Sequence, residues 1–432
     1  MNLFAVRLKA LGSENAFKIV ENIQECLSLG IDVIRLNIGE PDFDTPAHIA
    51  RVGVEQMQKG NTHYCHPAGI LPLREAVAEQ LSQTRGITVD PEQVVVTIGA
   101  KPTISYAMIA YVNEGDEVIY PSPGFPIYES WVSFFGAKAV PLHLEEKRDF
   151  RFTADDLEKL ITPKTKMIFI NSPSNPTGSV LTAGDLEGIA EVIRRKCSPA
   201  VRIYSDEIYE HVLFDGLKHK SIASYPGMQE RTLICSGHSK TYAMTGWRLG
   251  FAALPTKVEA EVFKNLNINI VSCVPPFIQE AGREAYESPS SEASIRTMVT
   301  KFQERRDYAV PALNAIPGIT CAMPQGAFYL FPNIEGACRN IGMLEVMDKL
   351  PGDIRAKTFP SKLFQMFLLY RYGVATMDRK SFGQVGADGK HFIRLSIASS
   401  IESIKEGIHR ISMAAQDRAG FATFIDEAKH LY

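Results

Sequence analysis

The sequence predicts an α/β fold built on a seven-stranded, mostly parallel sheet. Between about Val94 and Leu254, short β-branched or aromatic runs alternate with segments of helical period, a pattern typical of a parallel sheet covered by helices. The chain has 432 residues, more than one hydrophobic core usually spans, so a second domain is expected. The predicted strands are Val94–Ile98, Glu117–Tyr120, Lys138–Leu142, Met167–Ile170, Val201–Ser205, Thr232–Cys235 and Arg248–Ala253.

The rest of the chain predicts a smaller α+β domain assembled from both chain ends. We expect residues 46–290 to form the large domain, and residues 1–45 and 291–432 to form the small one. A long helical stretch from Val258 to Glu287 is expected to join them. The expected elements of the small domain are strands at Gly318–Cys321, Phe328–Phe331, Val374–Met377 and Phe392–Leu395, and a closing amphipathic helix from Ile401.

Composition excludes several classes of partner. Apolar residues make up 45% of the chain, charged residues 22%, and the net charge of -3 gives no basic surface for nucleic acid or an anionic membrane. The seven cysteines are scattered and never spaced as Cys-x-x-Cys, which argues against a disulfide framework or zinc site and favours reduced thiols in a cytosol. The N-terminus lacks the features of a signal peptide, and no apolar run is long enough to span a bilayer. We therefore expect a cytoplasmic protein without a metal.

Polar and glycine-rich segments follow four of the predicted strands. Functional residues in such sheets gather at the carboxyl ends of strands, so these segments are candidates for a site. Lys240 stands out because lysine amines become nucleophilic towards carbonyls in a cofactor pocket. A single strand-end lysine is nevertheless more often a solvated surface charge, so its neighbours must decide. The segments are Gly99-Ala-Lys-Pro-Thr103, Asn171-Ser-Pro-Ser-Asn-Pro-Thr-Gly178, Asp206-Glu-Ile-Tyr209 and Ser236-Gly-His-Ser-Lys240.

The segment Ser239-Lys-Thr-Tyr-Ala-Met-Thr-Gly-Trp-Arg-Leu-Gly250 resembles the lysine signature of class I aminotransferases. This resemblance covers nearly the whole chain, and the bacterial-type aspartate and broad-range aminotransferases are the most similar subgroup. It implies the fold type I architecture of enzymes that use pyridoxal 5′-phosphate (PLP), normally a homodimer with active sites shared between subunits. The other matching segments are Asn37-Ile-Gly-Glu-Pro-Asp-Phe43, Tyr64 with Pro67-Ala-Gly69, Asn175-Pro-Thr-Gly178, Ser205-Asp-Glu-Ile-Tyr209, Gly326-Ala-Phe-Tyr329 and Ile393-Arg-Leu-Ser396.

The resemblance implies that Lys240 forms a Schiff base with PLP and later acts as general acid and base. Asp206 would pair with the ring nitrogen of the cofactor and raise its pKa, which keeps the ring protonated as an electron sink. Tyr209 and Asn175 are the implied donors to the phenolate oxygen. Taken alone, Asp206 also suits a helix N-cap, and Asn175 suits a turn before Pro176.

The phosphate of PLP needs fixed donors and positive charge. A strand followed by Gly99, Ala100 and Lys101 at a helix start offers backbone N–H groups and a favourable dipole. Ser239 and Arg248 are expected to join them, because the planar guanidinium suits a pair of phosphate oxygens. A phosphate cup is therefore expected beside the lysine.

Four further residues complete the expected site. The resemblance implies that Tyr64 reaches the phosphate of the neighbouring subunit's cofactor and that Phe125 stacks on the pyridine ring, although an aromatic residue is also ordinary in a core. Arg394 is expected to grip the substrate's α-carboxylate through two parallel hydrogen bonds; outside this motif a surface ion pair would be preferred. The Gly39 backbone and Asn175 are the implied companions of Arg394 at the substrate.

The chain departs from the family pattern at four places. Gly237 stands where the family often has a serine three residues before the lysine, so one phosphate contact is expected to be missing. Met377–Gly383 replaces a common Pro-Gly turn with charged residues, which indicates a solvated loop more than extra positive charge at the entrance. Residues 336–361 form an apparent insertion of a length typical of lids or interface elements. The tail from Gln416 to Tyr432 is longer than the family pattern, and its apolar residues follow helical spacing, which favours ordinary packing against the rest of the protein.

These observations together predict an aminotransferase that moves the amino group of an L-α-amino acid to a 2-oxo acid by a ping-pong reaction. Aspartate or glutamate is an expected partner, because Lys101 either meets a distal carboxylate or supports the phosphate, although no second arginine matches. A PLP-dependent lyase or β-decarboxylase is the alternative on the same fold. A PLP-sensing transcription regulator is disfavoured by the near-neutral charge and by a fold that starts close to Met1.

Overall fold

The computed structural model describes residues 3–12, 15–427 and 429–432. It contains a seven-stranded sheet of order β2-β8-β7-β6-β5-β3-β4, in which β8 runs antiparallel to both neighbours and the other pairs are parallel. The predicted α/β class is therefore confirmed. The strands are β2 (Val94–Ile98), β3 (Glu117–Ser122), β4 (Lys138–His143), β5 (Thr165–Asn171), β6 (Arg202–Asp206), β7 (Thr232–Gly237) and β8 (Leu249–Ala253).

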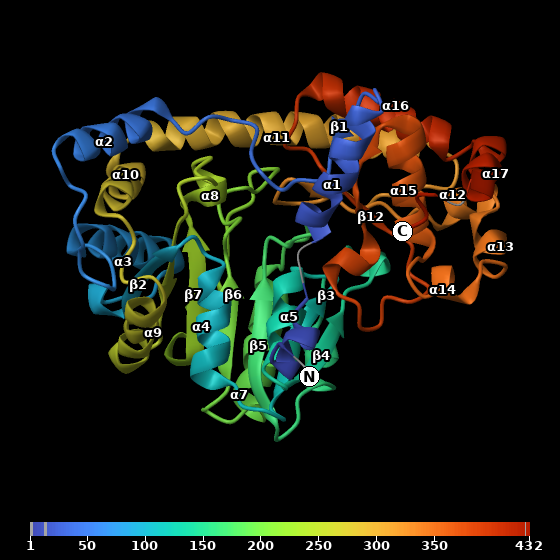
Figure 1. Cartoon of the computed structure of the whole chain (residues 1–432). Coiled ribbons are helices and arrows are strands. Elements are labelled where there is room, and N and C mark those ends of the chain that lie inside the picture. Colours follow the sequence, from blue (N-terminus) through green and yellow to red (C-terminus); the bar gives the residue numbers. More distant parts are fainter. Residues whose placement is uncertain (1–2, 13–14, 428) are drawn as a thin grey trace.

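Helices cover both faces of this sheet (Figure 1). Met167 and Phe169 of β5 face one layer of helices, and Ile168 and Ile170 face the other. This double burial explains why the strands are continuous apolar runs in the sequence. One layer contains α4 (Pro102–Tyr111), α5 (Pro126–Phe134) and α9 (Lys257–Ile270), and the other contains α3 (Leu71–Arg85), α6 (Ala154–Glu158) and α7 (Ala183–Lys196).

The predicted joining helix from Val258 to Glu287 is wrong. Two helices, α9 and α10 (Pro276–Glu287), stand in its place. Pro276 has no N–H to continue the first helix and disfavours helical backbone at the residue before it, so the periodicity is interrupted although the apolar pattern continues. The helix that runs from the α2 (Ala47–Gln58) and α10 end of the molecule to the C-terminal elements is α11 (Ser290–Asn314), along the top of Figure 1.

Segments from the two ends of the chain lie together. Strand β1 (Ile34–Arg35) pairs in parallel with β10 (Val374–Ala375), and α1 (Asn15–Ser28) packs on α15 (Pro360–Tyr372). The N-terminal segment thus shares its core with residues near the C-terminus. Beside them a three-stranded antiparallel sheet is formed by β11 (Met377–Asp378), β12 (Ile393–Ser396) and β9 (Tyr329–Leu330).

Two of the expected strands in this region are different in the structure. Gly318–Cys321 contributes only an isolated bridge between Thr320 and Asn333, because Gly318 has a positive φ of 86° that interrupts extended backbone. The expected strand Val374–Met377 is divided into β10 and β11, which pair with different partners. The closing helix from Ile401 is confirmed as α16 (Ile401–Ala414).

The insertion and the C-terminal tail pack against each other. Val346, Leu350 and Ile354 of the insertion line an apolar groove together with Ile425 and Leu431 of the tail. Phe421 and Phe424 of the tail are buried, as plain packing predicts. The helices concerned are α12 (Glu335–Asn340), α13 (Met343–Met347), α14 (Gly352–Arg355) and α17 (Arg418–Glu427).

The described part of the chain contains seven free cysteines. It holds no group of three or more His, Cys, Asp or Glu side chains arranged to bind a metal ion. In the same residues, no helix is both long enough and apolar enough to cross a membrane.

Candidate active site

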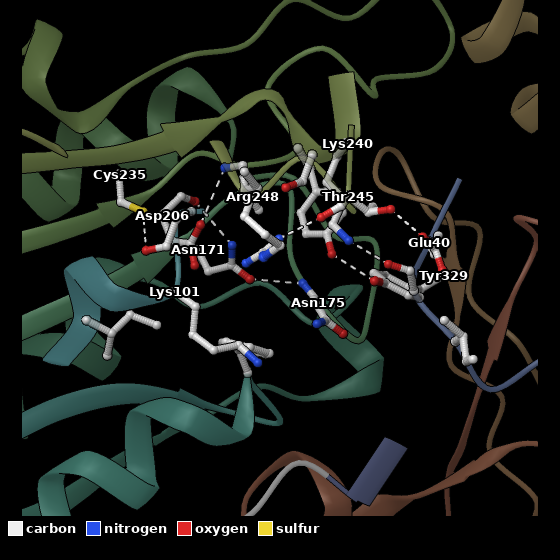
Figure 2. A pocket seen from close by; sticks show the side chains of 18 of the residues that line it. Glu40, Lys101, Asn171, Asn175, Asp206, Cys235, Lys240, Thr245, Arg248 and Tyr329 are labelled. Carbon is white, nitrogen blue, oxygen red and sulfur yellow. Dashed lines mark hydrogen bonds between the residues drawn. The ribbon is translucent and has the colours of Figure 1, made fainter. Parts of the chain in front are cut away.

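A cavity of about 560 Å³ lies where the carboxyl ends of the sheet strands meet the segment around Gly39 and the C-terminal elements. Figure 2 shows Lys101, Asn175, Asp206, Lys240 and Arg248 around it. The structure therefore brings together candidates that are far apart in the sequence. The predicted residues that line the cavity are Gly39, Ala100, Lys101, Phe125, Asn175, Asp206, Tyr209, Ser239, Lys240, Arg248 and Arg394.

Two predicted residues are absent from this lining within the described chain. Gly99 lies directly behind Arg248: a Cβ at Gly99 would meet Nη2 of that guanidinium, and its φ of +74° suits glycine. Gly99 therefore leaves the space that the arginine occupies. Tyr64 lies elsewhere, with 90% of its surface exposed to solvent. Tyr64 is therefore not part of this cavity within one chain.

Lys240 reaches the cavity from α8 (His238–Thr241), the short helix that follows β7. Its Nζ donates a hydrogen bond of 2.5 Å to the carbonyl oxygen of Gly39. Position 237 must be glycine, because a Cβ there would lie 2.8 Å from Cα of Gly250 in β8. Ser236 cannot replace the missing serine, because its hydroxyl points away from the cavity and donates to Oε1 of Glu210 at 2.7 Å.

Asp206, the last residue of β6, is buried in the floor of the cavity. Its Oδ2 accepts a hydrogen bond of 2.5 Å from the Tyr128 hydroxyl, and its Oδ1 accepts one from the Ile208 N–H at 3.3 Å. Burial raises the pKa of Asp206 to about 6, against the lowering effect of the Tyr128 hydrogen bond. No helix starts at residues 207–212, so the N-cap alternative for Asp206 does not apply. A cation in this cavity would stabilise the carboxylate.

Tyr209 and Asn175 also line the cavity. The Tyr209 hydroxyl shares a hydrogen bond of 2.7 Å with the Tyr329 hydroxyl, and burial holds the pKa of Tyr209 well above its usual value. Asn175 keeps its backbone N–H on Oδ1 of Asn171 at 2.9 Å, which fixes the loop after β5. Both side chains therefore enter the cavity as neutral hydrogen-bonding groups.

Arg394, on β12, is 4% exposed and lies between two aromatic rings. Its guanidinium carbon is 4.4 Å from the ring centroid of Tyr329 and 4.8 Å from that of Phe382. Nη1 donates to Oδ1 of Asn175 at 2.9 Å, and Nη2 donates to the carbonyl oxygen of Asn37 at 2.5 Å. In the described residues Nε has no hydrogen-bond partner. Arg394 also lines the cavity, and a guanidinium held in this way is suited to an anionic ligand.

Positive charge gathers at the start of α4. Lys101 is the cap residue of that helix, and its Nζ lies 5.5 Å from the ring centroid of Phe125. Arg248 adopts a positive φ of 58°, and its Nη1 donates to the carbonyl oxygen of Thr245 at 2.8 Å. The backbone at Ala100, the helix dipole and the two cations form a cradle for a phosphate-sized anion.

Sequence reasoning missed several residues that shape this cavity. Tyr128 follows Phe125 by one helical turn, a spacing that could have suggested its contact with Asp206. Glu40 accepts a hydrogen bond from the Thr245 hydroxyl, which ties the Gly39 segment to the loop after Lys240. Both Glu40 and Thr245 lie inside motifs already recognised. Because they are 205 residues apart in the chain, the sequence gives no sign that they contact each other.

The expectation for the Met377–Gly383 segment is wrong. Arg379 is only 1% exposed, so it belongs neither to a solvated loop nor to a charged entrance. Its guanidinium donates to the carbonyl oxygen of Gly383 at 3.0 Å and to the Ser122 hydroxyl at the end of β3 at 3.2 Å. Desolvation lowers the pKa of Arg379 to about 10. The buried Arg379 side chain thus links the 377–383 turn to the central sheet through hydrogen bonds.

Comparisons with known proteins agree with this geometry. Residues 31–411 match the family described as aminotransferase class I and II. An aromatic-amino-acid aminotransferase of Thermococcus litoralis is 38% identical over 91% of this chain and 94% of its own length. A probable aspartate/prephenate aminotransferase of Aquifex aeolicus is 36% identical over 96% of this chain and 98% of its own. The solved aspartate aminotransferase of Rhizobium meliloti superposes with a TM-score of 0.85 at 33% identity, covering 96% of this chain and 99% of that one.

Proposed function

The chain belongs to the class I and II aminotransferases, which use PLP, and we propose that it moves the amino group of an L-α-amino acid to a 2-oxo acid in the cavity around Lys240. One observation carries this proposal: Lys240, the buried Asp206 and the guanidinium-bearing Arg394 all line one cavity. Amine, carboxyl and guanidinium are the groups needed for a carbonyl cofactor, its ring nitrogen and a substrate carboxylate.

The residues present fit PLP. Among the described residues, the Asp206 carboxyl accepts hydrogen bonds from Tyr128 and the Ile208 N–H and from no cation, and its pKa of about 6 would fall beside a protonated ring nitrogen. Arg248 and the start of α4 would hold the phosphate together with Ser239, and Phe125 would cover the ring. When bound, PLP supplies an electron sink for the electrons left by breaking the substrate's Cα–H bond.

The remaining chemistry belongs to the chain. Lys240 would hold the cofactor at rest and, once its amine is free, take the proton from the substrate Cα and later return one. Its present acceptor, the Gly39 carbonyl, keeps the amine pointed into the cavity. Arg394 would fix the α-carboxylate, and Asn175 would keep the guanidinium oriented through the 2.9 Å hydrogen bond. The Gly39 segment, tied down by Glu40, would exclude water.

Aspartate or glutamate is proposed as one partner. Lys101 supports this because it stands at the rim of the cavity beside Phe125, within reach of a side chain that extends from the substrate. The names of the Aquifex and Rhizobium relatives point in the same direction, although the Thermococcus relative is named for aromatic amino acids. A panel containing both acidic and aromatic donors separates these specificities.

A homodimer with shared active sites in the cytosol is proposed for the assembled enzyme. Tyr64 supports this, because a 90% exposed tyrosine in a matched family motif is explained by a contact with a second copy. Free thiols at all seven cysteines suit a reducing compartment. We also propose the domain division at 45/46 and 290/291, which the pairing of β1 with β10 and the course of α11 support.

The test is an absorption spectrum of the purified protein with PLP, before and after addition of single amino acids. Transamination predicts a visible band that a suitable donor bleaches, with one equivalent of 2-oxo acid released per site and the amino group retained on the cofactor. A lyase or β-decarboxylase would release ammonia or carbon dioxide while the band persisted. A protein that acquires no visible band with added PLP would overturn the proposal.

A further inference from the structure

The turn that follows β6 has two chemically different sides. Asp206 and Tyr209 line the cavity, whereas Glu207 and Glu210 point the opposite way and are 1% and 5% exposed. Carboxylates are almost never buried without a partner, because desolvation of a charge is costly. Two buried carboxylates directly behind the cavity therefore need an explanation that the reaction itself does not give.

Arg85, at the C-terminal end of α3, holds the two carboxylates together. Its Nε and Nη2 donate to Oε2 of Glu207 at 3.1 and 2.9 Å, and Nη2 also donates to Oε2 of Glu210. The side chains of all three residues are at most 3% exposed. One buried guanidinium thus bridges two buried carboxylates, in a cluster that lies between α3 and the ends of β6 and β7.

Hydroxyl groups and one imidazole complete the hydrogen bonding of the two carboxylates. Oε1 of Glu207 accepts from the hydroxyls of Ser205 and Ser221 at 2.9 and 2.5 Å, and its Oε2 is 2.9 Å from Nε2 of His219. Oε1 of Glu210 accepts from the Ser236 hydroxyl. The cluster is therefore fully hydrogen-bonded, which is the condition for holding buried charge at defined positions.

The charges of the cluster do not cancel between its carboxylates and Arg85. Burial alone would raise the pKa of Glu210, but Arg85, His211 and His219 together outweigh it and lower that pKa to about 2. Glu207 is likewise held ionised, by His219 and Arg85, against the effect of burial. Glu207 therefore keeps an ionised carboxylate on the residue that follows Asp206 in the chain. Its effect is visible at Asp206, whose pKa is raised first by burial and also by Glu207.

We propose that Glu207, with Glu210 in support, is a positioning residue for the reaction: its buried negative charge, fixed by Arg85, stabilises a protonated cofactor ring in front of Asp206. This inference rests on the proposed function, because it assigns Asp206 to the ring nitrogen. The same cluster also helps to orient Asp206 and Tyr209. Each of these two residues is followed in the chain by a glutamate that the cluster holds in place, Glu207 and Glu210 respectively. The cluster thus sets both the position of Asp206 and the electrostatic potential around its carboxylate.

The charged neighbours of each carboxyl define what a test must keep constant. The titratable groups that act on Asp206 or that it acts upon are Tyr128, Tyr204, Glu207, Tyr209, Cys235 and Lys240. Those that face Glu207 and Glu210 are Arg85, His211, His219, His238, Tyr242 and Tyr286. Substitution of a cluster carboxylate by its amide leaves all the other groups in place.

Glu207→Gln is the primary variant because the hydrogen bonds can survive it. The amide oxygen can take the place of Oε2 towards Arg85 and His219, while the amide NH2 donates to the hydroxyls of Ser205 and Ser221, which accept as readily as they donate. Glu210→Gln is accommodated in the same way, with the amide NH2 facing Ser236. Both variants remove one negative charge without removing a donor.

The measurement is the pH midpoint of the 15N chemical shift of the ring nitrogen in bound, 15N-labelled PLP, for the wild type and each variant. Removing a nearby negative charge destabilises the protonated form, so the midpoint is expected to fall by on the order of one pH unit in Glu207→Gln. Glu210→Gln, whose carboxylate is not adjacent to Asp206 in the chain, is expected to shift it by less. Glu292→Gln on α11 loses the same charge at a side chain that is 83% exposed and is expected to shift nothing.

A second readout needs no cofactor. In the cofactor-free protein, the effect of Asp206→Asn on the melting temperature is expected to grow with pH and to level off near the pKa of Asp206 in the folded state, and the pH of this plateau is expected to fall in the Glu207→Gln background. Unchanged values in both readouts, or shifts as large in Glu292→Gln as in Glu207→Gln, would overturn the inference. Failure of the wild type to form a visible band would overturn the proposed function instead, and the cofactor-free readout would still decide the role of Glu207.

Discussion

Replacement of Arg394 by lysine is expected to weaken the substrate carboxylate contact without removing the charge. Lysine retains a positive charge but cannot reproduce the planar fork that donates to Asn175 and Asn37 while the residue lines the cavity. It also loses the stacking between the rings of Tyr329 and Phe382. The expected effect therefore concerns geometry more than net charge.

The magnitude follows from the hydrogen bonds at stake. A hydrogen bond to a charged group contributes about 1.5–3 kcal/mol, and lysine can keep one such contact to the carboxylate. With the added loss of orientation, a penalty of about 2–4 kcal/mol is expected, which corresponds to a loss of roughly 30- to 1000-fold in kcat/KM. The loss is expected to be the same for different amino acids, because all carry the same α-carboxylate.

Steady-state kinetics with a paired substrate makes this assay specific. The donor amino acid is compared with the amine that lacks only its α-carboxylate, in the wild type and in Arg394→Lys. The amine is expected to be a poor donor in both proteins and to lose little more in the variant. An equal loss for the amino acid and the amine would refute the reasoning, because Arg394 would then support the structure of the site and not the carboxylate.

Further substitutions test other parts of the argument. Lys240→Ala is expected to abolish turnover and the covalently held visible band, because the amine is the group that would bond to the cofactor. Mixing it with an attenuated Tyr64→Phe variant is expected to restore activity through hybrid dimers, measured as a gain over the sum of the two homodimers. Gly237→Ser is expected to lower the melting temperature and not to improve PLP affinity, since the β8 backbone is 2.8 Å from its Cβ position. In the cofactor-free protein, Asp206→Asn is expected to raise the free energy of unfolding by up to about 3 kcal/mol above pH 7 and to leave it unchanged below pH 4. The sign follows because the pKa of Asp206 is raised in the folded state, so the ionised form at high pH destabilises the fold; equal effects at both pH values in denaturant titrations would contradict it.

The central sheet could be predicted from the sequence because its signal is local. Strands buried on both faces give continuous apolar runs, and the motif residues after them mark the edge where chemistry gathers. The same locality explains the error at residues 258–287. Apolar spacing continues through Val274 and Ile278, and only Pro275 and Pro276 show that one helix ends and another begins.

The features that could not be predicted depend on partners far away in the chain. The run Asp378-Arg379-Lys380 indicates a solvated loop by composition, and only the Ser122 hydroxyl, 257 residues earlier, shows that Arg379 is buried. Arg85 is similar: it stands where a last-turn arginine is usually exposed, and its partner Glu207 is 122 residues away. Neither pairing leaves a periodic trace in the sequence.

The pairing of β1 with β10 has a consequence for synthesis of the protein. Ile34 cannot pair with Val374 until that residue is synthesised, about 340 residues later. At translation rates of about 5–20 residues per second, synthesis of the intervening chain takes roughly 20–70 s. During that time α1 also lacks α15, the helix it packs on, which lies in the last third of the chain. The central sheet can therefore be complete while the N-terminal segment with α1 and β1 is still unpaired. We expect a chaperone that acts on this protein during synthesis to bind this segment.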